Sequence, residues 1–200
     1  MDEIVKQAIA KWPDVPHCYG WLALDARGAW RMRDESAQQQ DLPGERIVHP
    51  ALLGFIRRNY AADECGRWFF QNGPQRVYVN LELTPYIARS DPLHGFITQT
   101  DQPMDSIDAV WLTECARLIL RSNNKIAALD DRDLAPAIEQ LRIDNLVVSD
   151  TALLAWIDHQ SGAPSQQLHL LHNGRQLPVQ RIAQAALAQH FGFVCMPQPD

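Results

Sequence analysis

The sequence has 200 residues, of which 46% are hydrophobic and 21% charged, a balance that excludes a disordered chain and suits one substantial core or two small ones. Its formal net charge is −6, because residues 1–100 carry 11 basic and 12 acidic side chains while residues 101–200 carry 7 and 12. Neither half has the clustered Lys and Arg that neutralise nucleic-acid phosphates, so we expect no nucleic-acid partner.

The sequence also indicates a cytoplasmic protein. It begins with acidic residues, and no window approaches the roughly 18 apolar residues that identify a membrane span, so we expect no membrane partner. The four cysteines are scattered without any C-x-x-C pair, which favours reduced thiols over a disulfide framework or a zinc site. They are Cys18, Cys65, Cys115 and Cys195. We therefore expect no metal and no cofactor.

The first elements follow from periodicity and from helix and turn signals. Apolar positions from Ile4 to Trp12 lie on one face of a helix that Pro13 ends. Residues 19–33 have the pattern of a hairpin, and the polar stretch 36–45 is typical of a loop. Pro50 occupies the first position of a helix that ends before Gly66.

Three hairpins at a nearly constant spacing form the most informative pattern of the chain. Each has an apolar strand, a turn containing asparagine, and a second strand, and the asparagines Asn72, Asn123 and Asn173 are 51 and 50 residues apart. Asn-Gly is a strong hairpin signal because both central residues of a type I′ turn need positive φ. A period in this range predicts one structural unit used repeatedly.

The second half repeats the unit with some changes. We expect strands at 110–112 and 153–157, a turn at 161–165, and helices near 132–141 and 179–191, the last ended by Gly192. Trp21, Trp111 and Trp156 begin equivalent predicted strands, so we interpret these tryptophans as core residues.

Together these elements predict an α+β fold in which repeated antiparallel β-hairpin-plus-helix modules form two small packed subdomains. Residues 90–106, rich in Pro, Gly and Asp, are the expected junction. We place an N-terminal α+β half at 1–100 and a C-terminal half, with two further hairpin-helix repeats, at 101–200.

A resemblance to known families supports this fold. The run Gly66 to Val79 (GRWFFQNGPQRVYV), continuing to Leu83-Thr84-Pro85, resembles an uncharacterised proteobacterial family of domains of unknown function, as does the segment from Trp111 to Leu120. The order of strand, helix, hairpin and Thr-Pro break is more distantly similar to another uncharacterised bacterial family. That similarity implies repeated α+β motifs and suggests a signalling role, but it transfers no catalytic residues.

The sequence shows no catalytic constellation. It has no G-x-G-x-x-G, no G-x-x-x-x-G-K-[ST], no G-x-S-x-G and no H-E-x-x-H. His169 and His172 are three residues apart in a predicted strand, so they point to opposite faces and cannot share one metal ion. We assign no catalytic and no metal-binding residue.

The outward face of the first hairpin is the predicted ligand-binding site. With Asn72-Gly73 as a two-residue turn, Trp68 would face Val77 and Phe70 would face Gln75. The opposite face then combines aromatic surface with hydrogen-bonding and charged groups, and its two arginines could hold a carboxylate or phosphate. Its members are Arg67, Phe69, Arg76, Tyr78, Asn80 and Glu82. The alternative is a packing surface in which Phe69 and Tyr78 lie beneath another element.

These observations favour a non-enzymatic binding or regulatory protein of the cytoplasm, with a signalling role among the options, that recognises a small anionic ligand or a partner protein. The alternative is an enzyme acting on a small polar substrate, with an acid-base pair formed by Glu82 and either His49 or His94. A third reading is an oligomeric scaffold such as a homodimer, in which hairpin edges pair between chains.

Overall fold

A computed structural model describes residues 1–158 and 166–199, and these residues form two compact units. The first unit comprises Met1–Pro85, Gln99–Asp101 and Ala188–Asp200, and the second comprises Tyr86–Thr98 and Gln102–Leu187. This division differs from a single boundary at residue 100. Residues 86–98 join the second unit because their strands pair there, and the C-terminal segment joins the first because Val194 bridges to Arg67.

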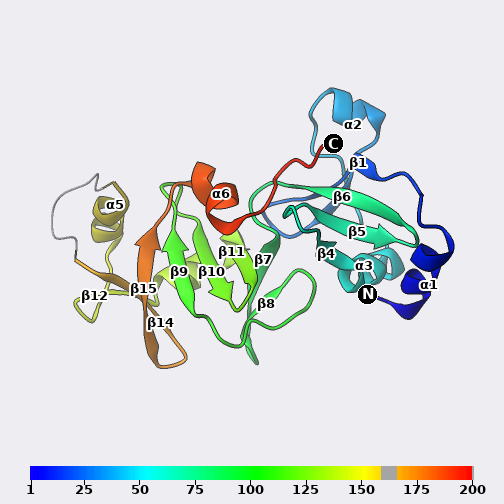
Figure 1. The fold of residues 1–200 in the computed structure, drawn as a ribbon. Coiled ribbons are helices and arrows are strands. Elements are labelled where there is room, and N and C mark those ends of the chain that lie inside the picture. Colours follow the sequence, from blue (N-terminus) through cyan, green and yellow to red (C-terminus); the bar gives the residue numbers. More distant parts are fainter. Residues whose placement is uncertain (159–165, 200) are drawn as a thin grey trace. The chain divides into compact units, whose positions relative to one another are not determined.

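Among the described residues the strands form one six-stranded and one nine-stranded sheet (Figure 1). The six-stranded sheet has the order β3-β2-β1-β6-β5-β4. Its strands are β1 Cys18–Leu24, β2 Trp30–Met32, β3 Glu45–Arg46, β4 Tyr60–Ala62, β5 Trp68–Asn72 and β6 Gln75–Leu81.

The nine-stranded sheet belongs to the second unit and has the order β13-β12-β14-β15-β9-β10-β11-β7-β8. Its strands are β7 Tyr86–Asp91, β8 Gly95–Thr98, β9 Ala109–Leu112, β10 Leu118–Ser122, β11 Lys125–Leu129, β12 Leu141–Ile143, β13 Leu146–Val147, β14 Leu168–His172 and β15 Arg175–Arg181.

The helices are short. They are α1 Glu3–Lys11, α2 Glu35–Gln39, α3 Pro50–Arg58, α4 Leu134–Ile138, α5 Asp150–Asp158 and α6 Leu187–Phe191, with 3₁₀ turns η1 Asp131–Asp133 and η2 Gln184–Ala186. None of the helices in the described ranges is long and apolar enough to cross a membrane. The mixture of sheets and short helices confirms the predicted α+β class.

The three predicted hairpins are confirmed, with a small change in the first turn. The turn residues are Gly73-Pro74, Asn123-Asn124 and Asn173-Gly174, so the turns are spaced by 50 residues. Gly73, Asn123 and Asn173 have φ of 59°, 56° and 47°, the left-handed region that Gly and Asn tolerate best. Asn72 therefore ends β5 instead of forming the turn, because Gly73 takes the positive-φ position.

Each hairpin is part of a larger repeated pairing that the sequence does not reveal. The strand that follows each turn also pairs in parallel with another strand: β6 with β1, β11 with β7, and β15 with β9. The sheets are therefore mixed, which corrects the expectation of purely antiparallel modules. Pairings of this kind join segments far apart in sequence, so no local turn signal predicts them.

Several local predictions were wrong. Residues 36–45 begin with a helix, α2, because Asp34 accepts a hydrogen bond from the Ala37 amide and caps it. Residues 153–157 lie in helix α5 and not in a strand, and Val179 lies in β15 before the last helix. The turn expected at 161–165 lies outside the described residues.

The prediction that three tryptophans belong to the core is confirmed for two of them. Trp111 is buried in β9, and Trp156 is buried as well, although it lies in helix α5 and not in a strand. Trp21, in β1, is 41% exposed, so its core assignment was wrong. Successive side chains of a strand point to opposite faces of the sheet, so a position at the start of a strand does not by itself determine burial.

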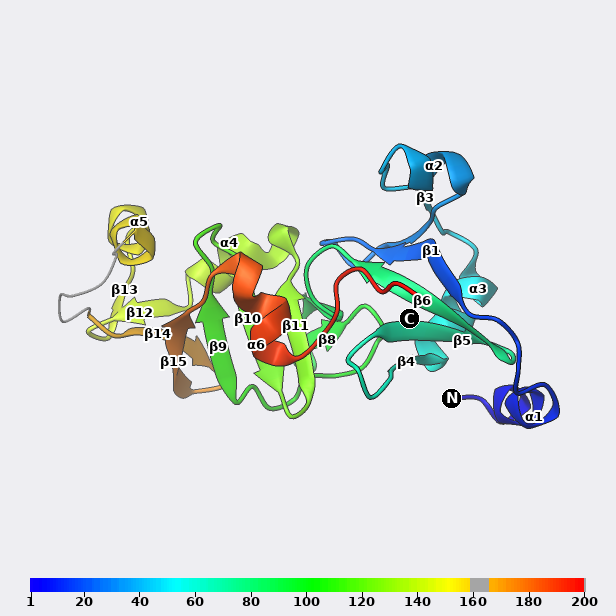
Figure 2. The same cartoon turned by 45° about the horizontal axis from the view of Figure 1, so that its top comes forward.

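The sheet of the first unit has one aliphatic face and one face that mixes aromatic with polar side chains. Leu22, Leu24, Val79 and Leu81 are nearly fully buried and share one face by the parallel register of β1 and β6. Helix α3 packs beside β5, and Figures 1 and 2 show it next to this part of the sheet. The Phe55 ring meets the Phe70 ring edge-on at 5.3 Å. The other face carries the residues considered below.

Candidate ligand-binding cleft

The predicted binding face lies on β5 and β6 with an altered register. Phe70 pairs with Val77 instead of Gln75, and Phe69 pairs with Tyr78, because the turn is centred one residue later than expected. The partner shifts by two residues, and a shift of two keeps every side chain on its original face. Phe69, Tyr78 and the other predicted site residues on the two strands therefore share one face, as the alternation predicts.

The aromatic part of this face is a packed cluster. Tyr78 is 1% exposed and Phe69 is 4% exposed. The Tyr78 ring stacks on Tyr19 with centroids 4.6 Å apart and meets Phe69 edge-on at 5.8 Å. These two side chains belong to the core of the first unit, which is the packing alternative that the sequence left open.

Arg67 is held by an internal carboxylate. Asp63, in the turn between β4 and β5, lies 2.8 Å from Arg67 Nε, and its other contacts come from the Tyr78 hydroxyl at 3.0 Å and two backbone amides. Burial acts to raise the pKa of Asp63, but the hydrogen bonds from Arg67 and Tyr78 lower it by more, so the carboxylate stays ionised. Arg67 and Asp63 therefore neutralise each other.

Arg76 lies over the face of the Phe69 ring, with its guanidinium carbon 4.6 Å from the centroid. No carboxylate among the described residues pairs with it. Arg76 therefore makes a cation–π contact with Phe69 at the edge of the aromatic cluster.

Asn80 and Glu82, the last two predicted residues, line a cleft of about 490 Å³ in the first unit. The cleft lies beyond the aromatic cluster, where β6 ends, and its walls come from β1, β2, the segment after α2 and the C-terminal segment. Its polar lining residues are Asp25, Arg31, Arg33, Asp41, Asn80, Glu82 and Cys195. The structure thus divides the predicted face into a packed cluster and an open cleft.

Sheet register determines the floor of the cleft. Ala23 on β1 pairs with Arg31 on β2 and with Asn80 on β6, so the three residues form one row across the sheet. Neighbouring strands lie about 4.8 Å apart. The methyl group of Ala23 therefore leaves space between the larger polar side chains of Arg31 and Asn80 on either side.

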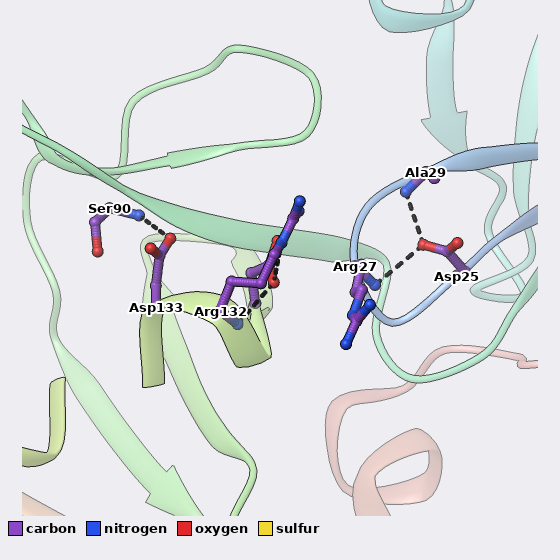
Figure 3. A network of polar contacts seen from close by, with 7 residues as sticks. Asp25, Arg27, Ala29, Ser90, Arg132 and Asp133 are labelled. Carbon is purple, nitrogen blue, oxygen red and sulfur yellow. Dashed lines mark hydrogen bonds and ion pairs between the residues drawn. The ribbon is translucent and has the colours of Figure 1, made fainter. Parts of the chain in front are cut away.

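Asp25 holds Arg31 in place. Its Oδ1 accepts hydrogen bonds from the backbone amides of Arg27 and Ala29 at 3.0 and 2.8 Å, an arrangement visible in Figure 3. Its Oδ2 accepts a hydrogen bond from Arg31 Nε at 2.7 Å. The β1–β2 turn and the guanidinium of Arg31, which lines the cleft, are therefore held by the same carboxylate.

Arg33 forms a buried wall. It is 7% exposed, and it donates to the Leu42 carbonyl at 2.9 Å and to Asp41 Oδ1 at 3.0 Å. It also donates to the Ala37 carbonyl at 3.4 Å. These contacts attach α2 and the following segment to the end of β2, so Arg33 supports the cleft more than it offers donors to it.

Three polar side chains of the cleft, Arg31, Asn80 and Glu82, keep hydrogen-bonding capacity that no contact in the described chain uses. Within the described chain the Asn80 amide has no hydrogen-bond partner, and Glu82 uses only Oε2, which accepts from the Ala26 amide at 3.0 Å. Arg31 uses Nε toward Asp25 and one Nη1 hydrogen toward the Gly44 carbonyl at 3.3 Å. Free donors thus lie on Arg31 and Asn80, and a free carboxylate oxygen lies on Glu82.

Among the described residues, no hydrogen bond or ion pair joins Glu82 to His49 or His94, the acid-base pairs considered in the sequence. His49 caps α3, where its Nδ1 accepts from the Leu52 amide at 3.4 Å, and His94 lies in the second unit with Nδ1 2.9 Å from Asp105. Burial raises the pKa of the Cys195 thiol in the cleft, which keeps it protonated. Within the described residues no three His, Cys, Asp or Glu side chains gather to hold a metal ion.

Sequence reasoning found Asn80 and Glu82 but missed Ala23, Asp25, Arg31 and Arg33. The signal for Asp25 was present, since an aspartate at the start of a short hairpin turn commonly accepts hydrogen bonds from the backbone amides of the following residues. The role of Ala23 and Arg31 depends on the parallel pairing of β1 with β6, which no turn connects.

Comparison with known proteins places the chain in a family. A family model named DUF2944 and described as "Protein of unknown function (DUF2946)" matches residues 1–198. The chain belongs to this family. The predicted membership of an uncharacterised family is therefore confirmed. The comparison with curated proteins finds no match.

Among solved structures, the chain is similar to a DUF1285 family protein from Silicibacter pomeroyi DSS-3. The sequences are 11% identical, the TM-score is 0.49, and the alignment covers 90% of this chain and 96% of the other.

Proposed function

We propose that this DUF2944 protein is a non-enzymatic binding or regulatory protein of the cytoplasm, whose first unit holds a small ligand through an anionic group. The site is the cleft at the end of β6. A signalling role would follow if binding of the ligand changes the affinity of the protein for a partner protein.

The observation that carries this proposal is the set of free polar groups around Ala23. Arg31 and Asn80 rise on both sides of this small residue, and neither uses its full hydrogen-bonding capacity within the described chain. A carboxylate or phosphate oxygen above Ala23 could accept from both, and an arginine binds such anions through paired N–H groups.

The surroundings of the cleft favour holding a ligand over reacting with it. A volume of about 490 Å³ lies within the usual range for small-molecule sites. The described lining contains no histidine, lysine or serine, and its thiol is protonated. Asp25 and Arg33 fix the walls through several hydrogen bonds each, so little ordering is needed when a ligand enters.

A thermal-shift titration with small carboxylates and inorganic phosphate tests the proposal. Binding at 100 times Kd adds about 2.7 kcal/mol to the free energy of unfolding, which raises Tm by several degrees. The Arg31→Gln variant should lose most of this gain. The Arg46→Ala variant is the matched control, since Arg46 pairs with Arg31 across β2 and β3 but does not line the cleft.

A second variant, Ala23→Leu, keeps every polar group and fills the floor. It should fold normally and lose the ligand-induced shift. If no carboxylate or phosphate raises Tm, or if the gain survives both Arg31→Gln and Ala23→Leu, the cleft is not the binding site.

A further inference from the structure

The charge balance of the cleft restricts the ligand further. The lining has three carboxylates, on Asp25, Asp41 and Glu82, and two guanidiniums, on Arg31 and Arg33. These groups sum to a charge of −1 near neutral pH. A ligand that carries only negative charge therefore meets a net repulsion, whereas a ligand that also carries a positive group does not.

The unused hydrogen-bond donors of the cleft also lie apart from its unused acceptor. Asn80 and Arg31 offer donors in the row that crosses Ala23, and Glu82 lies two residues after Asn80, just past the end of β6, where it also lines the cleft. Two residues of a strand span about 7 Å. The cleft thus has a donor end over Ala23 and an acceptor end at the free oxygen of Glu82.

One wall is apolar. Leu42 and Met196 line the cleft and are 47% and 56% exposed, and Pro43 lies beside them. Exposed apolar side chains beside free polar groups would be covered by a ligand that has an apolar part as well as its charges.

We propose that the ligand is a small zwitterion, with a carboxylate at Arg31 and Asn80, a protonated amine at Glu82, and a short apolar group against Leu42 and Met196. An amino acid with an apolar side chain has this chemistry. The inference rests on the proposed function, because it assigns the class of ligand to the same cleft.

Three matched probes test it by calorimetric or thermal-shift titration of the full chain: L-leucine, its deaminated counterpart 4-methylpentanoate, and its decarboxylated counterpart 3-methylbutylamine. We expect L-leucine to bind most tightly. Removing either charged group should weaken binding about 10- to 100-fold, the range for a charge-assisted hydrogen bond.

The Glu82→Gln variant assigns the amine. Its side-chain carbonyl can still accept from the Ala26 amide, so the turn should keep its structure. In this variant L-leucine should bind about as weakly as 4-methylpentanoate binds the unaltered protein. Arg46→Ala again serves as the control and should leave all three affinities within about twofold.

The outcomes separate the two proposals. If 4-methylpentanoate binds as tightly as L-leucine, with loss in Arg31→Gln, the anion site stands and the zwitterion inference is wrong. If L-leucine binding does not change in Glu82→Gln, the amine is not at Glu82 and the inference is also wrong. If none of the three probes binds while phosphate or another carboxylate still raises Tm, the anion site stands and the zwitterion inference is wrong. If no anion binds at all, both proposals are wrong.

Discussion

The two β-meanders, β4-β5-β6 in the first unit and β9-β10-β11 in the second, have the same plan but end differently. Residues 50 apart are equivalent, so Asn80 corresponds to Asp130 and Glu82 to Arg132. In the second unit Arg132 Nε donates to both oxygens of Asp130 at 3.0 and 3.1 Å, and the two charges neutralise each other. In the first unit the equivalent side chains face an open cleft.

The neighbouring strands differ in the same way. In the first unit the row beside Asn80 contains Ala23 and Arg31. In the second unit the pairing of β11 with β7 ends at Leu129 and Ala88, and continuing this register by one residue brings Arg89, the partner of Ile97, to the equivalent position. The small residue of the floor is thus replaced by a long one, and the arginine of the wall by an apolar side chain. Nearby, Asp133 of the second unit accepts from the Ser90 amide at 2.7 Å (Figure 3).

The same pairing of a meander with a parallel strand occurs in both units, so the backbone arrangement by itself does not form an open cleft. The side chains at the end of the third strand decide whether the polar groups there pair with each other, as in the second unit, or stay open, as in the proposed site of the first unit. Five predictions would break or sharpen this contrast.

The largest effect is expected at Tyr78, whose counterpart is the fully buried Ala128. Replacing Tyr78 with Ala should lower the free energy of unfolding by about 3 to 5 kcal/mol, because a large buried ring is lost. Tyr78→Phe should cost only about 1 to 2 kcal/mol, since it removes the hydrogen bond to Asp63 alone. Urea unfolding measures both, and equal losses in the two variants would contradict the packing role of the ring.

Asp63 and its counterpart Thr113 should differ in a similar way. Asp63→Ala should cost about 3 kcal/mol because Arg67 and Tyr78 both lose their acceptor. Thr113→Ala should cost about 1 kcal/mol, since Thr113 Oγ1 accepts only from the Arg117 amide. Hydrogen exchange in β5 and β10 would assign each loss to its own meander, and a greater cost for Thr113→Ala would refute the comparison.

The turn before the second strand provides a third contrast. Gly66 has φ of 76°, and a Cβ there would lie 2.1 Å from the Gly192 carbonyl oxygen, so Gly66→Ala should cost more than about 2 kcal/mol. Its counterpart Ala116 has φ of 57°. Ala116→Gly relieves this strain but loosens the unfolded chain, so stability should change by less than about 1 kcal/mol. Thermal unfolding of both variants checks the pair.

Acid should weaken the Asp63 network. Because the folded pKa of Asp63 is lowered, its contribution to stability is fully present above the unfolded pKa of about 3.9 and is lost as the pH falls through the folded value. Unfolding experiments from pH 6 to pH 2 should therefore show the unaltered protein losing stability faster than Asp63→Asn below about pH 4. Parallel curves for the two proteins would mean that the network does not favour the ionised form.

The smallest change in stability is expected when the Asp130–Arg132 ion pair of the second unit is copied to the equivalent positions of the first unit. The double variant Asn80→Asp, Glu82→Arg places the side chains of Asp130 and Arg132 in the first unit. Its stability should stay within about 1 kcal/mol, because position 82 is exposed and a charge pair formed there contributes little. Its binding of small carboxylates should nevertheless be lost. Retained binding in calorimetry would show that the free groups at the end of β6 are not the ligand contacts.

The sequence predicted those parts of the fold that depend on neighbours along the chain. The hairpin turns follow from Gly and Asn at positive φ, and helices α1 and α3 follow from Pro13, Pro50 and the apolar periodicity. Helix α5 was missed because a short apolar run does not distinguish a strand from a helix. The hydrogen bond from the Ala152 amide to Ser149 shows that an N-cap signal was present there.

The sequence predicted only part of the candidate site. Alternation along β6 grouped Asn80 and Glu82, and this grouping survived the shift in register. Phe69 and Tyr78 proved to be core residues, because nothing in a two-strand pattern says which face another layer will cover. Arg67 was assigned to a ligand although Asp63, four residues earlier, already neutralises it.

By itself the sequence determined the α+β class, the three equivalent hairpins and the sharing of faces along each strand, since all of these follow from local backbone preferences and a period of two. Only the tertiary structure decided that β1 lies in parallel against β6, and with it that Ala23 separates Arg31 from Asn80. The physical reason is that hydrogen bonds between strands far apart in sequence depend on how the whole sheet packs. No local sequence pattern encodes their register.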